Sequence, residues 1–203
     1  TAKNALTDKV GNALDPMFTR TFYVQGLSPY VLENRSNDSP ARATPLAALQ
    51  AGGDGSFTSG ASYAVGTSPY QVAAGDVNGD GQLDVVTANR DADNVSVLRG
   101  KGDGTFQAAV NYAAGDGAIS VAVGDLDGQH GPDLVVANYY AHTVSVLLNN
   151  GDGTFGVKVD YAVGTNPRGV LVADLNGDAR LDVVAANEGS DNLSVLLGNG
   201  SGG

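Results

Sequence analysis

The chain has 203 residues, of which 42% are apolar, and its formal charge is −11. This length and composition predict one or two soluble globular domains, and no stretch is long and apolar enough to span a membrane. The absence of cysteine excludes disulfides, thiolate metal sites and cysteine nucleophiles. The acidity argues against nucleic-acid binding, which depends on clustered Lys and Arg.

The charge is unevenly distributed along the chain. Residues 1–52 hold five Lys or Arg and four Asp or Glu, net +1, whereas residues 53–203 hold six and eighteen, net −12. Half of those eighteen acids lie in three short loops, so the acidity is local and directed at a ligand. No charged-then-apolar signal segment precedes Thr1, and we expect the chain to be part of a longer protein.

The first 52 residues differ from the rest. Residues 1–24 contain a turn-rich loop followed by an alternating strand, and they predict the C-terminal end of a β-sandwich. Residues 25–44, with two prolines and a Ser/Asn/Asp cluster, predict a linker. Residues 45–50 predict a degenerate last strand of a preceding β-sheet unit, so the repeat region is expected to cover 45–203.

From residue 53 onward the sequence repeats every 49 residues, in the units 53–101, 102–150 and 151–199. Each unit contains a Gly-Asp-Gly-Ser/Thr-Phe turn, a tyrosine, an acidic nine-residue loop and a closing run similar to Asn-Val-Ser-Val-Leu. A period of this length indicates an array of supersecondary units that cannot bury their apolar faces alone.

Within the first unit, Val- and Leu-rich runs alternate with Gly/Asn/Asp turns, which predicts short antiparallel strands. The candidates are residues 61–65, 71–75, 83–88 and 94–99. Four such strands make one blade of a β-propeller, so we expect an all-β fold with three four-stranded antiparallel blades. Three blades do not close a ring, and the open blade edges predict self-association.

The acidic loops present oxygen ligands at alternate positions, as a tight loop around a hard divalent cation does. An oxygen-only set favours calcium over zinc. Positions 1, 3, 5 and 9 supply side chains and position 7 a backbone carbonyl, and the predicted ligands are Asp76, Asn78, Asp80, Gln82 and Asp84; Asp125, Asp127, Gln129, Gly131 and Asp133; and Asp174, Asn176, Asp178, Arg180 and Asp182.

The three loops differ most at position 6. Gly81 can adopt a left-handed backbone there at little cost, whereas His130 and Ala179 cost on the order of 1 kcal/mol. The second loop also moves one carboxylate from position 5 to position 3, so each loop keeps three. We therefore expect the first loop to be the best site.

Two other kinds of calcium loop do not fit the sequence. An EF-hand needs an acid at position 12 and a following helix, but position 12 is Thr87, Val136 or Ala185 within strand-like runs. The nonapeptide repeats of β-helices recur every nine residues rather than every 49.

The paired motifs of residues 53–203 resemble FG-GAP or VCBS repeats, the blade units of integrin α-subunit propellers and of many secreted bacterial proteins. The matching features are the Gly-Asp-Gly-Thr-Phe turns and the Asp-x-Asn-x-Asp-Gly-x-x-Asp loop. The resemblance implies one calcium in each loop, up to three ions in all. Residues 11–14 and 18–22 are similar to the end of a bacterial Ig-like domain.

Other side chains have structural interpretations. The tyrosines Tyr63, Tyr112 and Tyr161 are expected to pack between blades, and the Gly-Asp-Gly motifs to form tight turns. Tyr139 and Tyr140 break the repeat and could instead stack on a sugar. His130 and His142 belong to no nucleophile motif, so we expect no enzyme.

Family analogy predicts an extracellular, secreted or cell-surface, adhesion or binding scaffold that contacts a protein or a glycan. Two alternatives stay open. The chain could be a non-catalytic accessory segment of a larger secreted polysaccharide-degrading enzyme, or a purely structural spacer.

Overall fold

The structure is a computed structural model, and it describes residues 20–22, 30–32 and 56–202. The chain divides into two compact units, Thr1–Thr58 and Ser59–Gly203.

The described strands of the first unit form an antiparallel pair. Strand β1 (Arg20–Phe22) pairs with β2 (Tyr30–Leu32), with Arg20 opposite Leu32. Strand β2 lies within residues 25–44, for which the sequence predicts a linker, and its Tyr-Val-Leu run favours β-structure. The boundaries of the linker stay a prediction. The expected Ig-like sandwich and the strand at 45–50 lie outside the described residues.

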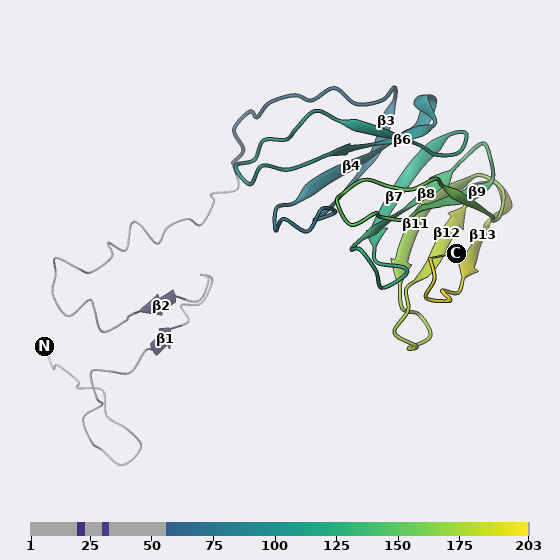
Figure 1. Cartoon of the computed structure of the whole chain (residues 1–203). Helices are drawn as coiled ribbons and strands as arrows, with labels where there is room; N and C mark the ends of the chain where they lie inside the picture. Colours follow the sequence, from purple (N-terminus) through teal and green to yellow (C-terminus); the bar gives the residue numbers. More distant parts are fainter. Residues whose placement is uncertain (1–19, 23–29, 33–55, 203) are drawn as a thin grey trace, which may run out of the picture. The chain divides into compact units, whose positions relative to one another are not determined.

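The second unit consists of three antiparallel sheets (Figure 1). The first sheet contains β3 (Pro69–Gly75), β4 (Asp84–Asn89), β5 (Asn94–Leu98) and β6 (Val110–Ala113). The second contains β7 (Ala118–Gly124), β8 (Asp133–Asn138), β9 (Thr143–Leu147) and β10 (Val159–Ala162). The third contains β11 (Pro167–Ala173), β12 (Asp182–Asn187) and β13 (Asn192–Leu196). The predicted all-β class with blade-like antiparallel sheets is confirmed.

Short 3-10 turns η3 (Arg90–Ala92) and η4 (Glu188–Ser190) follow β4 and β12. In the described residues, no helix is long and apolar enough to cross a membrane.

The grouping of strands differs from the prediction in one respect. The fourth strand of each complete sheet, β6 or β10, comes from the next sequence repeat, after its Gly-Asp-Gly-Thr-Phe turn. Residues 61–65, predicted as the first strand of the first blade, are not assigned to a strand, and the third sheet has three strands. A repeating sequence determines the period of the array, but it does not determine which strand begins each sheet.

Two apolar clusters lie between successive sheets. One joins the first two sheets through Val97, Val121 and Leu134, and the other joins the second and third through Val146 and Val183. Strand β8 is buried along its whole length because both faces of its sheet are covered. Each sheet therefore depends on its neighbours for burial, as in other repeat proteins.

A buried polar pair recurs inside each sheet. The Asn138 side-chain amide donates to the Ser145 hydroxyl at 2.7 Å, and this hydroxyl donates to Asp160 on β10 at 2.6 Å. In the first sheet the Ser96 hydroxyl donates to Asn111 at 2.7 Å in the same way. These bonds satisfy polar groups that would otherwise destabilise the sheet interior.

Candidate functional site

The acidic loops connect the first two strands of each sheet, β3 to β4, β7 to β8 and β11 to β12. The Gly-Asp-Gly turns follow the third strand and lie at the same end of the sheets, because antiparallel pairing places Leu98 opposite Val85. Both repeated motifs therefore lie at one end, which we call the loop end.

The last carboxylate of each loop is fully buried. Asp84, Asp133 and Asp182 have no exposed surface. Asp133 accepts backbone hydrogen bonds from Leu126 and Asn149, both at 2.8 Å. Equivalent bonds hold the other two loops, so this carboxylate ties its loop to the turn that follows the third strand.

In the first and third loops, the carboxylate at position 1 accepts hydrogen bonds from the loop's own backbone amides. Asp174 accepts bonds from the amides of Gly177, Asp178 and Ala179 at 2.7, 3.2 and 2.9 Å. Asp76 caps the first loop in the same way. Such capping satisfies the carboxylate without a cation.

The second loop is arranged differently. Its Asp125, Asp127 and Asp133 each offer a carboxylate oxygen, and these three oxygens lie within 4.8 Å of one another. Within the described part of the chain, Asp125 accepts an amide bond only from Gly128, at 2.8 Å, and Asp127 only from Gln129, also at 2.8 Å. Among the described residues, this is the group of acidic side chains that the geometry brings together.

The carboxylate pKa values also differ between the second and third loops. Burial raises the pKa of Asp133 above its ordinary value, and the charges of Asp127 and Asp125 raise it further. The pKa of Asp174 is lowered, chiefly by the hydrogen bond from the Ala179 amide. Burial and the neighbouring carboxylates thus disfavour the ionised form of Asp133, which a nearby cation would favour.

The remaining predicted ligands hold their loops together. Asn78 accepts from the Asp80 amide at 3.0 Å, and Asp80 accepts from the Gln82 amide at 2.8 Å. The third loop repeats these bonds through Asn176, Asp178 and Arg180. The preference for the first loop stays a prediction, whereas the convergence of carboxylates favours the second.

The expected left-handed backbone at position 6 is confirmed. The φ angle is +80° at Gly81, +60° at His130 and +66° at Ala179. The sequence identified this position because two loops carry a residue other than glycine where the first loop has one.

A polar and aromatic group lies at the opposite end of the sheets. Tyr140 packs edge-on against Tyr139, with ring centroids 5.1 Å apart. Arg168 donates to the Tyr70 hydroxyl at 3.0 Å and pairs with Glu188 at 2.7 Å. We call this group, which consists of Tyr70, Tyr139, Tyr140, Arg168 and Glu188, the tyrosine end.

Sequence reasoning singled out only the two adjacent tyrosines of this group. Tyr70 and Arg168 were detectable as departures from the repeat, since the same position in the second unit is Ile119. Arg90 also lies over the Tyr70 ring, 5.8 Å from its centroid. Tyr70, Tyr140 and Arg168 are about half exposed.

The repeated aromatic residues pack between sheets, as predicted. Tyr112 and Phe155 form an edge-to-face pair with centroids 5.3 Å apart, and Tyr63 and Phe106 form another at 5.5 Å. His142 accepts a hydrogen bond from the Asn166 amide at 3.0 Å, which fits a structural role.

The fold and the loops define a repeat protein of blade-like β-sheets with one acidic loop in each. The FG-GAP-like repeat family matches residues 34–87, 76–136 and 130–185, which together span more than half of the chain. The chain therefore belongs to the FG-GAP-like repeat family.

Two solved structures illustrate the similarity. An Agrocybe aegerita lectin, described as recognising non-reducing terminal N-acetylglucosamine, is 32% identical with a TM-score of 0.45; the match covers 64% of this chain and 35% of the lectin chain. The Photorhabdus luminescens Tc holotoxin pore is 19% identical with a TM-score of 0.45, covering 66% and 7% of the two chains. The chain thus spans about a third or less of these proteins. No curated protein matches it.

Proposed function

We propose that the acidic loops bind calcium, with the second loop as the principal site. The observation that carries this proposal is the convergence of Asp125, Asp127 and Asp133 around one point. Carboxylate oxygens are the ligands that calcium prefers, and a bound cation removes the repulsion among three close negative charges. Three ions would change the formal charge from −11 to −5, because each adds two positive charges.

The proposed role of the ion is to stiffen the junction between β7 and β8. Asp133 would contribute to the ion through the same carboxylate that accepts the Asn149 amide. The Asn149 side chain donates in turn to the Val77 carbonyl at 2.7 Å, in the neighbouring loop. An ion at this site would therefore strengthen a connection that runs between two sheets.

We further propose that the protein is a non-catalytic extracellular binding scaffold whose ligand surface is the tyrosine end. Tyr70 and Tyr140 are about half exposed, and aromatic rings of this kind can stack on a sugar ring, while Arg168 and Glu188 offer hydrogen-bonding groups for its hydroxyls. This surface lies away from the loop end, so calcium would support it without touching the ligand. Millimolar extracellular calcium suits sites of the affinity known for extracellular modules.

Calorimetric titration with calcium tests the metal site. We expect binding with a Kd of about 10⁻⁴ to 10⁻³ M, and a loss of the tightest site in Asp127→Asn. Asp103→Asn is the matched control, because Asp103 is an exposed carboxylate that caps Thr105 in a Gly-Asp-Gly turn. Equal titrations of both variants would contradict the assignment to the second loop.

A glycan array tests the ligand surface. We expect specific, calcium-dependent binding that Tyr140→Ala and Arg168→Ala each weaken at least tenfold, while Leu175→Ala leaves it unchanged. Leu175 is similarly exposed but lies in the third acidic loop. If no glycan on the array is bound, a spacer or a protein-binding role is favoured. If glycan binding is weakened by neither Tyr140→Ala nor Arg168→Ala, the ligand binds at another surface.

A further inference from the structure

Asn149 follows strand β9 and is buried, with 4% of its surface exposed. Its side-chain amide donates to the Val77 carbonyl at 2.7 Å and to the Pro132 carbonyl at 2.8 Å, and its side-chain oxygen accepts from the Gly151 amide at 2.8 Å. Its backbone amide donates to Asp133 at 2.8 Å. Val77 belongs to the first acidic loop, and Pro132 and Asp133 belong to the second. One buried residue therefore bonds two acidic loops.

This side chain is a departure from the repeat. One period away on either side the residue is glycine, Gly100 or Gly198. The backbone bond to the last carboxylate of the loop recurs at both glycines, at 2.8 Å, but glycine has no side chain that could reach a neighbouring loop. A Cβ at either glycine would collide with the carbonyl oxygen at position 8 of the loop, on Leu83 or Leu181. The first and third units therefore exclude asparagine at this place.

The second acidic loop has a different backbone at this contact. Its position 7 is Gly131, which has a φ of +89° and directly precedes Pro132. Position 7 is Gln82 in the first loop and Arg180 in the third, and neither has a positive φ. In the second loop the carbonyl at position 8 accepts a bond from Asn149 instead of colliding with its Cβ.

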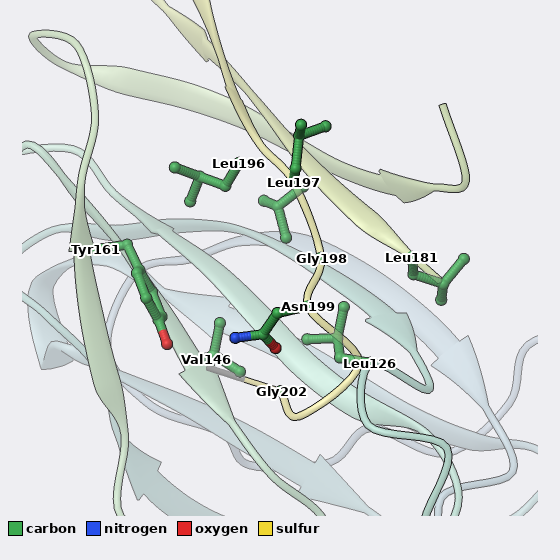
Figure 2. Close-up of a pocket in the computed structure, with 10 residues that line it drawn as sticks. Leu126, Val146, Tyr161, Leu181, Leu196, Leu197, Gly198, Asn199 and Gly202 are labelled. Carbon is green, nitrogen blue, oxygen red and sulfur yellow. The ribbon is translucent and has the colours of Figure 1, made fainter. Parts of the chain in front are cut away.

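Packing between a loop and the next turn is common to both sheet junctions. Gly153 lies against the first loop and Gly202 against the second, where an added Cβ would be 2.9 and 3.3 Å from the nearest Cβ of the loop. Figure 2 shows the second of these junctions, with Gly198, Gly202 and Leu126 around one pocket. Leu126 is the counterpart of Val77, but Gly198 has no side chain to donate to its carbonyl. The two junctions share their packing and differ in this hydrogen-bonded link.

We propose that Asn149 couples the first and second acidic loops, so that calcium in the second loop orders the first, whereas the third loop is independent of both. This inference rests on the calcium proposal above. Asp133, once bound to calcium, holds the Asn149 backbone amide, and the Asn149 side chain then restrains the Val77 carbonyl in the first loop. A loop that is already ordered loses less conformational entropy when it binds its own ion, so its affinity rises. Linkage makes this effect reciprocal.

Repulsion between bound ions would act in the opposite direction. Because the repeat spaces successive loops alike, repulsion should affect the second and third loops as it affects the first and second. Comparing these two pairs of loops therefore separates the Asn149 link from charge repulsion.

Hydrogen exchange measured by mass spectrometry tests the link in a protein that keeps only the second loop intact. Asp80→Asn and Asp178→Asn weaken the first and third loops, and calcium is added to a concentration that just saturates the second. We expect calcium to slow exchange in residues 76–84 about fivefold, at the lower end of typical coupling between sites, and to leave residues 174–182 unchanged. Slower exchange in residues 125–133 shows that calcium is bound.

Asn149→Gly in the same protein removes the side chain but keeps the backbone bond to Asp133, as glycine does in the other two units. We expect calcium still to slow exchange in the second loop but no longer in the first. Asn150→Gly is the matched control, because the exposed Asn150 side chain donates to Thr154 within its own turn at 3.0 Å. This control should respond like the parent protein, and circular dichroism checks that both variants are folded.

Calorimetric titration measures the consequence for affinity. With the third loop weakened by Asp178→Asn, the first and second loops together should bind calcium more tightly than the sum of the two single-loop titrations. With the first loop weakened by Asp80→Asn, the second and third loops should reproduce that sum. Equal behaviour of the two pairs would contradict the coupling.

The exchange experiment separates a failure of this inference from a failure of the calcium proposal. The coupling is overturned if calcium slows exchange in the second loop but in neither neighbour, or equally in the first and third loops. It is also overturned if Asn149→Gly leaves the response of the first loop unchanged. An unchanged second loop would overturn the calcium proposal, and the coupling with it.

Discussion

The second and third sheets carry almost the same repeat in different surroundings. Val146 in the second sheet is 4% exposed, whereas its counterpart Val195 in the third is 51% exposed. Since the two residues are identical, the neighbouring sheet and not the residue type decides the burial. The repeat is therefore a unit that becomes stable only beside another unit.

The largest expected effect is a difference in unfolding free energy between a substitution in the buried second sheet and one on the exposed face of the third sheet. Leu134→Ala removes a fully buried side chain between the first and second sheets, and we expect a loss of about 2–5 kcal/mol in unfolding free energy. Leu193→Ala, on the open face of the third sheet, should change it by less than about 0.5 kcal/mol.

Urea unfolding of the two variants measures this difference. Equal losses for both variants would mean that the two sheets have similar surroundings, contrary to the structure.

A smaller effect concerns the polar interior of the second sheet. Burial raises the pKa of Asp160, but hydrogen bonds from Lys158 and Ser145 together outweigh it, so the pKa lies below its ordinary value of 3.8. The resulting stability is present above that value and is lost as the pH falls through the lowered pKa. Because Asp160 is partly exposed, we expect a contribution below about 1 kcal/mol.

Asp160→Asn makes this position equal to Asn111 in the first sheet. The variant should lose less stability than the original protein between neutral pH and about pH 3 in urea unfolding, since its amide does not titrate there. All other carboxylates are common to the two proteins, so the difference isolates Asp160. Parallel pH profiles would contradict the assigned bonds.

The smallest expected effect on stability concerns position 6 of the acidic loops, and it should be equal in the second and third sheets. His130→Gly and Ala179→Gly each place glycine at a left-handed position, which relieves about 1 kcal/mol of backbone strain but costs about half of that in chain entropy. We expect each variant to gain about 0.5 kcal/mol, measured by thermal unfolding without calcium. Unequal gains would show that the neighbouring sheet also affects the loops.

The sequence predicts most of this fold because the 49-residue period, the strand pattern and the position 6 glycine are all local features. It does not predict the start of each sheet, since residues 61–64 (Ala-Ser-Tyr-Ala) and the fourth strand β6 (Val-Asn-Tyr-Ala) share the same pattern. Only the position of the neighbouring strand distinguishes them.

For the acidic loops, the sequence identifies the carboxylates, but it does not show which groups each carboxylate contacts. Asp76 and Asp125 occupy the same position, yet the first is capped by three amides and the second by one. Similarly, Tyr70 and Arg168 lie 98 residues apart, and pairing between sheets brings them together.

Calcium-dependent thermal unfolding tests the central claim most directly. For a site with a Kd of about 1 mM, calcium at about 10 mM stabilises by about 1.4 kcal/mol, which corresponds to a rise of about 3–6 °C in Tm for a unit of this size. We predict this rise for the original protein, a smaller rise for Asp127→Asn in the second loop, and an intermediate one for Asp178→Asn in the third. An unchanged Tm of the original protein at millimolar calcium would contradict the account.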